Sequence, residues 1–471
     1  MKLFYTIGFI IFYLSLFSQT KITVEKSDYK NEQLIFYAYS DYITSLKDSI
    51  AVVRTDENGA FTISVNIQNS KQIFIDLGVY HCSFYAEQNK NYQLSLPQKR
   101  LKTKAEELNI YFEPIELSLA LTHTPLRDLN RLIASFDDIY EEFLSKNFDS
   151  IYHSPNPKLI DKFEKDINKF YSEINHPFFR TYRKYKINEL RFLGPNRSFE
   201  TITFYYYNQK AISYTNPAYM HLFNLMYKDF FNVYGNTPDG EGLQIAVKEG
   251  RTVKRIINIL DQNAAFSDKN LEEFVLLKGI HDELFNSRTS NQIHFPKPQM
   301  KIILDSIAEF SPIYQHRLIA SNILKKYKKE DSIIGKSLPN FKFKSITGTE
   351  KSLDDFKGKY VYLNFMRTDV VPAMESMDRL INFYKNHKID IEIVTIFMDQ
   401  DSSNFYKLDT VKYNWNLLYS EDNKQILNFF KLITWPQFYL ISKEGKIIMS
   451  PAPSIKEDFE IKFFDWMDSK K

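Results

Sequence analysis

The side chains that could perform redox, nucleophilic or metal chemistry are few in this chain of 471 residues. Cysteine occurs once, at Cys82, so no disulfide can form within the chain. Cys82 lies in "YHCSFYAEQ", a stretch in which apolar and polar residues alternate. Two interpretations stay open: a buried core thiol, which we favour, and a reactive or intermolecular thiol.

The sequence predicts neither a metal site nor a cofactor. The nine histidines are scattered along the chain, at His81, His123, His153, His176, His221, His281, His294, His316 and His387. No His-x-x-x-His or Cys-x-x-Cys pattern accompanies them, and the usual nucleotide-binding and hydrolase motifs are missing. The acidic segment "DQDSSN" at 399–404 lacks the glycine and the distant glutamate of a calcium loop, so we interpret it as a solvated loop after a strand.

The charge of the chain argues against nucleic acid as a partner, while its aromatic content leaves a glycan partner open. The net charge is +3, and the short basic run at 325–329 is interpreted as the solvated end of a helix, so we expect no nucleic-acid binding. The aromatic cluster "TFYYYNQ" at 203–209 has two interpretations. It forms core in a helical region, which we favour, or it is a stacking platform for a glycan.

Residues 1–19 have the pattern of a secretory signal peptide. Lys2 is followed by an apolar run from Leu3 to Phe17 and then by small or polar residues. The run is short for a bilayer span, so an uncleaved anchor is the minor alternative. The rest of the sequence shows no membrane-spanning segment. We therefore expect an exported protein, in the periplasm or associated with the cell envelope.

The remaining chain divides into three regions. Residues 20–103 hold short runs of β-branched and aromatic residues, with a hairpin signal at "DENG" (56–59), and predict a β-sandwich. Residues 104–332 are predicted to be mainly helical, because apolar residues recur at threes and fours, as in 271–285, where they form one apolar face. Residues 333–471 restore glycine, proline and turn signals and alternate strand with helix.

The last region is predicted to be an α/β domain. "YVYLNFM" at 360–366 is a continuous apolar strand, and helical spacing follows at 373–388. A strand at 390–399, a strand pair at 437–450 and a closing helix at 457–468 complete the pattern. Strand, helix and strand in this order imply a right-handed crossover in a partly parallel sheet. The fold class is thus multidomain α+β.

On these features, residues 333–471 resemble the thioredoxin superfamily, and within it the exported bacterial TlpA-like thiol-disulfide oxidoreductases. The resemblance rests on "GKSLPNFKFKSITGTEKSLDDFKGKYVYLNF", on "TWPQFYLISKEGKI" and on the terminal helix. The layout ahead of it, a β domain and a helical spacer, is also similar to exported proteins of this kind. The resemblance implies a thioredoxin-like fold for this region.

The same resemblance locates an active site from which the thiols are absent. In active members the strand leads to Trp-Cys-x-x-Cys, where a helix N-terminus activates the first thiolate and the second thiol resolves the mixed disulfide. By position, Asp369 stands at the tryptophan, Val370 at the first cysteine, Val371 and Pro372 at the spacer, and Ala373 at the second cysteine. Neither a valine nor an alanine side chain can perform this chemistry, so the resemblance implies a degenerate, redox-inactive site.

The family also carries a cis-proline that faces this loop, and Pro436 in "ITWPQFYL" matches it. Either Pro436 only preserves the turn, which we favour, or the groove beside it still pairs with an extended peptide. Trp435 is unusual at its position. We favour a core or groove-filling role for it over stacking on a partner.

The sequence therefore favours an exported, redox-inactive thioredoxin-like protein that binds envelope proteins or extended peptides, and we lean towards a non-enzymatic role. Two alternatives stay open. One is an enzyme with non-standard chemistry, for example through Cys82. The other is a glycan- or ligand-binding envelope protein that uses the β-sandwich or the aromatic cluster.

Overall fold

The structure is a computed structural model, and the residues it describes are 19–103, 106, 109, 112–122, 125–153, 156–193, 199–238, 240–263, 265–285, 295–330, 333–387, 391–399, 401–420, 423–432 and 434–468. The predicted signal segment lies outside the described residues except for its last position. Within the described part of the chain, no helix combines the length and the apolar character needed to cross a membrane.

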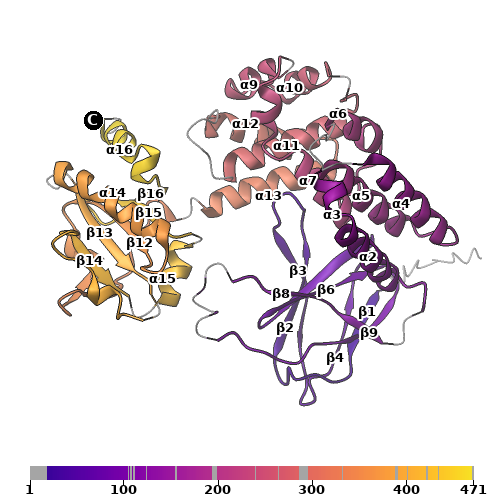
Figure 1. The fold of residues 1–471 in the computed structure, drawn as a ribbon, viewed down its shortest axis with the longest axis horizontal. Helices are drawn as coiled ribbons and strands as arrows, with labels where there is room; N and C mark the ends of the chain where they lie inside the picture. The colour runs from indigo at the N-terminus through magenta and orange to yellow at the C-terminus, as the bar shows by residue number, and fades with distance from the viewer. Residues whose placement is uncertain are drawn as a thin grey trace, which may run out of the picture. The chain divides into compact units, whose positions relative to one another are not determined.

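The described residues form two compact units, and each is treated by itself (Figure 1). The first unit takes its residues from Met1–Arg100, Ile115–Asn286 and His294–Asn322. The second takes them mainly from Ile323–Lys471, together with Leu101–Pro114. The β-strand region and most of the helical region therefore belong to one unit, and the α/β region forms the other.

The first unit opens with a two-sheet β-sandwich, as the sequence predicts. The five-stranded sheet has the order β3 (Lys47–Arg54), β2 (Gln33–Tyr39), β5 (Lys71–Leu77), β6 (Tyr80–Ala86), β8 (Ile115–Ser118). The four-stranded sheet has the order β4 (Phe61–Val65), β1 (Thr20–Val24), β7 (Asn91–Ser95), β9 (Ala120–Thr122). Alternating side chains from both sheets, such as Ile22, Phe36 and Phe84, are buried together as one core.

The sandwich extends past residue 103 through β8 and β9. β8 pairs with β6 in parallel, and β9 pairs with β7 in antiparallel fashion, so one segment lies at the edge of both sheets. The buried Leu119 marks the point where the segment passes from one sheet to the other. Strands of three or four residues give almost no periodic signal, and non-local pairing alone defines them.

Helices complete the first unit. They are α2 (Leu129–Lys146), α3 (Phe148–Tyr152), α4 (Pro157–Phe170), α5 (Pro177–Leu193), α6 (Phe199–Ile202), a π-helix (Thr203–Tyr207), α7 (Pro217–Met226), α8 (Phe230–Gly235), α9 (Glu241–Lys248), α10 (Val253–Leu260), α11 (Lys269–Phe285), α12 (Lys297–Phe310) and α13 (Tyr314–Glu330), which continues past the unit boundary. The π-helix holds the aromatic cluster, in which Tyr207 is buried while Phe204 and Tyr205 are exposed.

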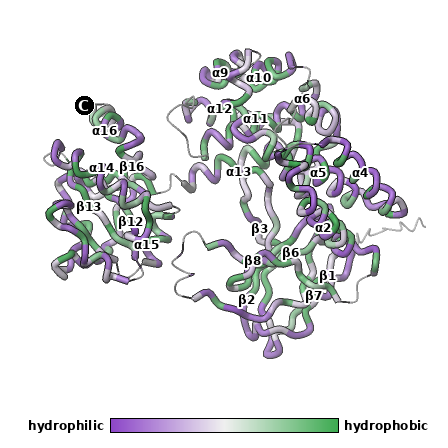
Figure 2. Tube along the Cα trace, viewed as in Figure 1, coloured by the Kyte–Doolittle hydropathy of each residue, from purple (hydrophilic) through white to green (hydrophobic). Residues whose placement is uncertain are grey.

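Helix α11 differs from the expected one-faced helix. Every residue from Leu271 to Glu283 is buried, so the helix is enclosed on all sides. Figure 2 shows hydrophobic and hydrophilic residues mixed along it. Its charged residues are therefore inside the protein, where they need partners. One of them is Lys278, which contacts both carboxylate oxygens of Asp282 at 2.5 Å.

Polar side chains join the sandwich to the helices within the first unit. Asn322 Nδ2 on α13 donates to Asp41 Oδ2 at 2.7 Å, and His176 Nε2 lies 2.8 Å from Glu87 Oε1. Such contacts are partly or wholly buried and directional, so they fix the orientation of the helices on the sheet as well as their distance.

The second unit is built on a seven-stranded mixed sheet. Its order is β11 (Glu350–Ser352), β10 (Lys342–Ser345), β14 (Asn416–Tyr419), β13 (Ile391–Phe397), β12 (Tyr360–Met366), β15 (Gln437–Ile441), β16 (Ile447–Ala452). The central strands β12, β13 and β14 are parallel, and the other neighbouring strands are antiparallel. The α-helices are α14 (Val371–His387), α15 (Asn423–Phe430) and α16 (Phe459–Asp468).

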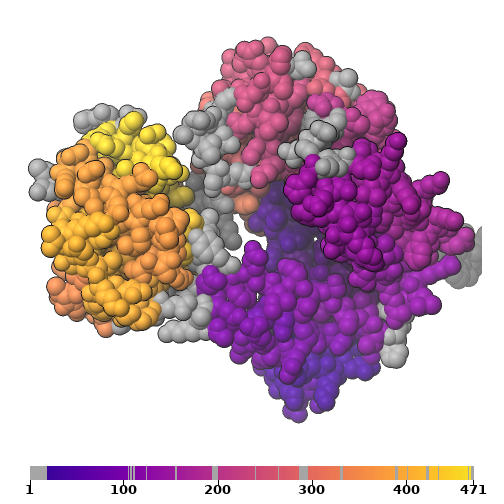
Figure 3. All heavy atoms as spheres, in the orientation of Figure 1, coloured from indigo at the N-terminus to yellow at the C-terminus, as the bar shows by residue number. Residues whose placement is uncertain are grey.

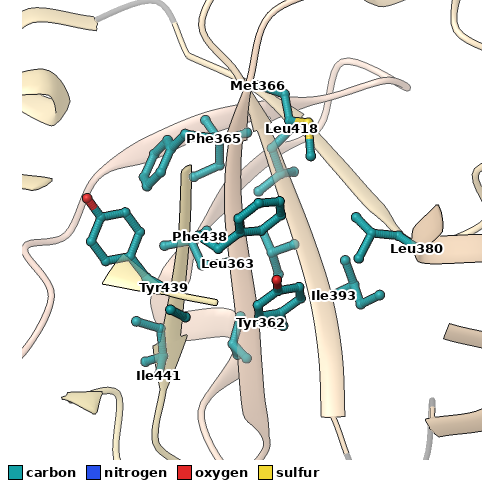
Figure 4. Close-up of a cluster of buried hydrophobic side chains, with 14 of the residues drawn as sticks. Tyr362, Leu363, Phe365, Met366, Leu380, Ile393, Leu418, Phe438, Tyr439 and Ile441 are labelled. Atoms are coloured by element: carbon teal, nitrogen blue, oxygen red, sulfur yellow. The ribbon is translucent and has the colours of Figure 1, made fainter. Parts of the chain in front are cut away.

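Helices cover both faces of the central strand β12, whose side chains are drawn in Figure 4. On one face, Tyr362 stacks on Phe459 of α16 at 3.9 Å between ring centroids and approaches Phe383 of α14. On the other face, Phe365 lies 4.6 Å from the ring of Phe430 at the end of α15. A strand buried on both faces needs apolar residues throughout, as "YVYLNFM" shows. The predicted α/β domain is confirmed.

A buried acid in the first unit makes its stability depend on pH. Glu272 on α11 is 0% exposed, and its burial, followed by the nearby Asp261, raises its pKa from 4.5 to about 7. Because the folded state favours the protonated form, this contribution to stability is complete below pH 4.5 and is lost as the pH rises through 7.

We expect Glu272→Gln to stabilise the first unit at pH 8 by about 1–3 kcal/mol, since the amide needs no ionisation, and to have little effect at pH 5. Thermal unfolding followed by circular dichroism at both pH values measures this. The exposed first-turn residue of α9 provides the control, Glu241→Gln, which should change neither midpoint. An equal effect of Glu272→Gln at pH 5 and pH 8 would contradict the ionisation argument.

Candidate functional site

The loop between β12 and α14 is the place where the sequence predicts a degenerate active site. The carbonyl of Val370 accepts hydrogen bonds from the backbone N–H groups of Ala373 at 3.0 Å and Met374 at 3.2 Å, which begins the helix. Pro372 lies in the first turn, where its missing N–H leaves no bond unmade. Ala373 is 0% exposed, whereas Val371 is 68% exposed, so the helix start is apolar both inside and at the surface.

The acid of this loop is paired within the loop itself. Arg367 Nε lies 2.9 Å from Asp369 Oδ1, and Arg367 Nη2 lies 2.6 Å from Asp369 Oδ2. This two-point contact is the strong geometry for a guanidinium and a carboxylate. The negative charge of Asp369 is therefore balanced locally and is not aimed alone at the helix N-terminus. Val370, at the first-cysteine position, is half-buried against the domain core.

A second acid, Asp399, holds the loop between β12 and α14 through hydrogen bonds to Thr368. Its Oδ1 accepts from the Thr368 N–H at 2.9 Å and from Thr368 Oγ1 at 2.7 Å. Its other oxygen, Oδ2, is buried and has no hydrogen-bond partner among the described residues. Burial raises the pKa of Asp399 above 3.8, with the charge of Asp369 adding to the effect and the Thr368 hydrogen bonds opposing it.

The sheet register brings the Trp435–Pro436 segment to the same edge. Phe365 pairs with Gln437, so the last residues of β12 lie beside the first residues of β15. The Trp435–Pro436 peptide bond is cis. Pro436 is half-buried, and Trp435 is 4% exposed and belongs to the domain core.

A buried polar network lies beneath the loop, in the middle of the sheet. Thr395 Oγ1 on β13 donates to Asn364 Oδ1 on β12 at 2.6 Å and accepts from Trp415 Nε1 at 2.9 Å. Asn364 and Thr395 are both 0% exposed. These bonds satisfy the polar side chains that interrupt two otherwise apolar strands.

Reactive groups are distributed differently from those of a thiol enzyme. Cys82 is on β6 of the first unit, fully buried, and burial raises the pKa of its thiol to about 11. A thiol with this pKa is protonated at neutral pH and is a poor nucleophile. Among the described residues, no three His, Cys, Asp or Glu side chains gather in an arrangement that could hold a metal ion.

The structure thus places Asp369, Val370, Val371, Pro372 and Ala373 in one strand–loop–helix segment, with the Trp435–Pro436 segment at the same sheet edge. Sequence reasoning missed Asp399, because it treated 399–404 as a solvated loop. The available signal was its position two residues after the end of the parallel strand β13, at the sheet edge where ligands and catalytic groups gather.

The second unit therefore has the sheet order, the helix start and the cis-proline of a thioredoxin-like domain, without the thiol pair. Comparison with known proteins gives the same class. The AhpC/TSA family matches residues 334–450. The thiol-disulfide oxidoreductase ResA of Bacillus thuringiensis is 32% identical over 138 residues, which cover 28% of this chain and 78% of that protein. ResA of Bacillus subtilis is 31% identical over 124 residues, which cover 26% and 68%.

Among solved structures, the thioredoxin domain of a thiol-disulfide oxidoreductase from Bacteroides vulgatus shares 23% identity, covers 28% of this chain and 96% of that chain, and has a TM-score of 0.26. The chain belongs, through its C-terminal domain, to the family of thioredoxin-like thiol-disulfide oxidoreductases. The only cysteine of the chain, Cys82, lies outside the matched residues.

We expect Thr395→Val to destabilise the second unit by about 3 kcal/mol, because it leaves Asn364 Oδ1 and Trp415 Nε1 buried with lost partners. Chemical denaturation followed by tryptophan fluorescence measures the change. Thr410→Val, at an exposed turn residue of the same domain, is the control and should shift the midpoint little. A loss below about 0.5 kcal/mol would show that water or a rearranged amide replaces these bonds.

Proposed function

We propose that this protein is an exported, redox-inactive member of its family that binds extended peptides or unfolded segments of envelope proteins at the carboxyl edge of β12. The observation that carries the proposal is a helix start of the family type in which Val370 and Ala373 occupy the thiol positions while Val371 stays exposed. Such an edge keeps a surface for binding and has no group that can exchange disulfides.

The chemistry of the edge supports an uncharged, apolar contact. Val371 is exposed at the first position of α14, and Pro372 beside it is also exposed. The carboxylate of Asp369 is held by Arg367, so charge at this point is balanced. An extended chain that lies across the edge would meet apolar side chains and, at the Trp435–Pro436 segment, backbone groups suited to strand-like pairing.

Export is supported by the sequence pattern of residues 1–19 and by the exported proteins that the chain resembles. The absence of cysteine pairs gives no argument against export, because the two compact units are stabilised by large aromatic and aliphatic cores. A protein of this kind in the periplasm or cell envelope would contact segments that are still unfolded.

Peptide binding can be measured without any thiol exchange. A fluorescently labelled insulin B chain with alkylated cysteines should bind the full protein with a Kd in the micromolar range, read by anisotropy. Val371→Asp should weaken binding at least fivefold, because a charge replaces an exposed apolar contact. Asp is well tolerated in a first helical turn, so the fold is kept.

Ile461→Asp is the matched control, since Ile461 is also exposed and also in a first helical turn, on α16. It should leave the anisotropy titration unchanged. The proposal that peptides bind at the carboxyl edge of β12 would be refuted by either of two results. One is no binding of the alkylated chain at millimolar protein, and the other is an equal loss of affinity in both variants.

The redox part of the proposal has its own test. The unaltered protein should not accelerate insulin reduction by dithiothreitol. The double variant Val370→Cys with Ala373→Cys should gain that activity, because these residues hold the positions where the helix start activates a thiolate. Turnover by the unaltered protein contradicts redox inactivity, and a folded double variant without activity contradicts the positional match.

A further inference from the structure

A second site candidate lies in the first unit, where α2 packs against the β-sandwich. Figure 3 shows the surface of this unit hollowed between its strands and its helices. Between α2 and the β-sandwich lies a cavity of about 440 Å³, within the range of small-molecule sites. It is lined by β6, by Gln72 of β5, by the segment of β8 and β9, and by one face of α2.

The cavity exists because an edge strand leaves the sheet. β8 pairs with β6 as far as Ser83, and the chain then passes to the other sheet. Beyond that point, Asn130 of α2 takes the place of the strand. Its Oδ1 accepts from the Tyr85 N–H at 2.6 Å, and its Nδ2 donates to the Tyr85 carbonyl at 2.9 Å. The strand edge is satisfied, while the space between α2 and the departing segment stays open.

The wall of the cavity is apolar in one part and polar in another. Leu119 and Ile133 are buried and provide apolar surface. Asp137 lies one turn of α2 beyond Ile133 and provides a carboxylate. The side chains of Gln72 and Ser83, which hydrogen-bond to each other at 2.9 Å, add oxygen acceptors.

The cavity wall holds two charged side chains, Asp137 and Arg131, both on α2. The hydroxyl of Tyr182 on α5 donates towards both carboxylate oxygens, at 3.0 Å and 2.9 Å. No described cationic side chain forms an ion pair with Asp137, and Lys186 acts on it only through space. An ionised carboxylate can accept about four hydrogen bonds, so sites on both oxygens remain available.

An aromatic ring completes the set of groups around the carboxylate. Tyr85 lines the cavity and meets Tyr182 edge-on, with 6.1 Å between ring centroids. The face of a tyrosine ring attracts cations, and more strongly where water is excluded. A carboxylate, an aromatic ring and neutral oxygen acceptors beside an apolar wall can hold a cation on a short aliphatic chain, and the exposed Arg131 is the charged group of the wall that such a ligand would have to avoid.

We propose that this cavity binds a primary alkylammonium group, with Asp137 as its counter-ion and the apolar wall against its methylene chain. The ammonium has three donors, which fits Asp137 together with neutral oxygens such as those of Gln72 and Ser83. The same chemistry can come from a free small amine or from a lysine side chain of another protein. This inference does not depend on the peptide binding proposed for the carboxyl edge of β12 in the second unit.

Binding should depend on pH through Asp137. Burial raises the pKa of this carboxyl to about 6, with Asp138 and Glu141 on α2 adding to it and Lys186 and Tyr182 on α5 opposing it. Tyr85 faces it from β6, and burial of the ring keeps that hydroxyl protonated. An alkylammonium needs the ionised carboxylate, so affinity should fall about tenfold between pH 8 and pH 5.

The full-length protein can be titrated with n-butylammonium chloride at pH 8 and pH 5 by calorimetry, with n-butanol as the uncharged control. Asp137→Asn should weaken n-butylammonium binding at least tenfold at pH 8 and remove the pH dependence. The amide keeps an acceptor for Tyr182, which preserves the fold. Asp138→Asn, at the exposed neighbouring position, should change nothing.

A peptide with one lysine, acetyl-Ala-Lys-Ala-amide, identifies the source. Tighter binding than that of n-butylammonium supports a protein-borne lysine, and weaker binding supports a free amine. Three results overturn the proposal: no binding of either probe, equal binding of n-butanol, or equal affinity of the unaltered protein at both pH values. The last comparison needs no variant, so it stands even if Asp137→Asn fails to fold.

Discussion

The second unit depends on one constraint, the complete enclosure of β12. This strand is paired on both edges and covered by helices on both faces, so any polar side chain on it must find a partner inside the sheet. Asn364 meets that requirement through Thr395, which in turn accepts from Trp415. With its interior closed in this way, the strand can present chemistry only at its carboxyl end, where the loop of Asp369 begins.

At the carboxyl end of β12, the loop and helix start keep the thioredoxin-like backbone arrangement and carry no thiol. A helix N-terminus favours an anion, and in active relatives that anion is a thiolate. Here the available anion, Asp369, is paired with Arg367, and the helix begins with valine and proline. The negative charge of Asp369 is thus balanced by Arg367 and does not face the helix N-terminus alone. Burial of Ala373 preserves the packing of the helix on the sheet. This arrangement of an internally paired acid and an apolar helix start is what the proposed peptide contact rests on.

How far the sequence predicts the molecule depends on how local the determining interactions are. The strand 360–366 is predicted residue for residue, because a continuous apolar run between turn signals is a local pattern. Asp399 is missed because its burial depends on Thr368, thirty-one positions earlier in the chain. The strands β8 and β9 are missed because they are defined by pairing with β6 and β7 and not by their own residues. Helix α11 is predicted as a helix, and its enclosure on all sides follows only from the helices around it.

In the first unit, hydrogen bonds between polar side chains and the sandwich fix where the helices lie on the sheet. Helices held to a sheet by apolar contact alone can slide, whereas the bonds of Asn130 to Tyr85 and of Asn322 to Asp41 each admit one position. Fixing α2 in this way prevents it from closing onto the segment that leaves the sheet, so a cavity persists. The carboxylate of Asp137 then stays ionisable beside an apolar wall, and its cost of burial is offset when a cation occupies the space. Binding capacity in this unit is therefore a consequence of how the sandwich and the helices are joined.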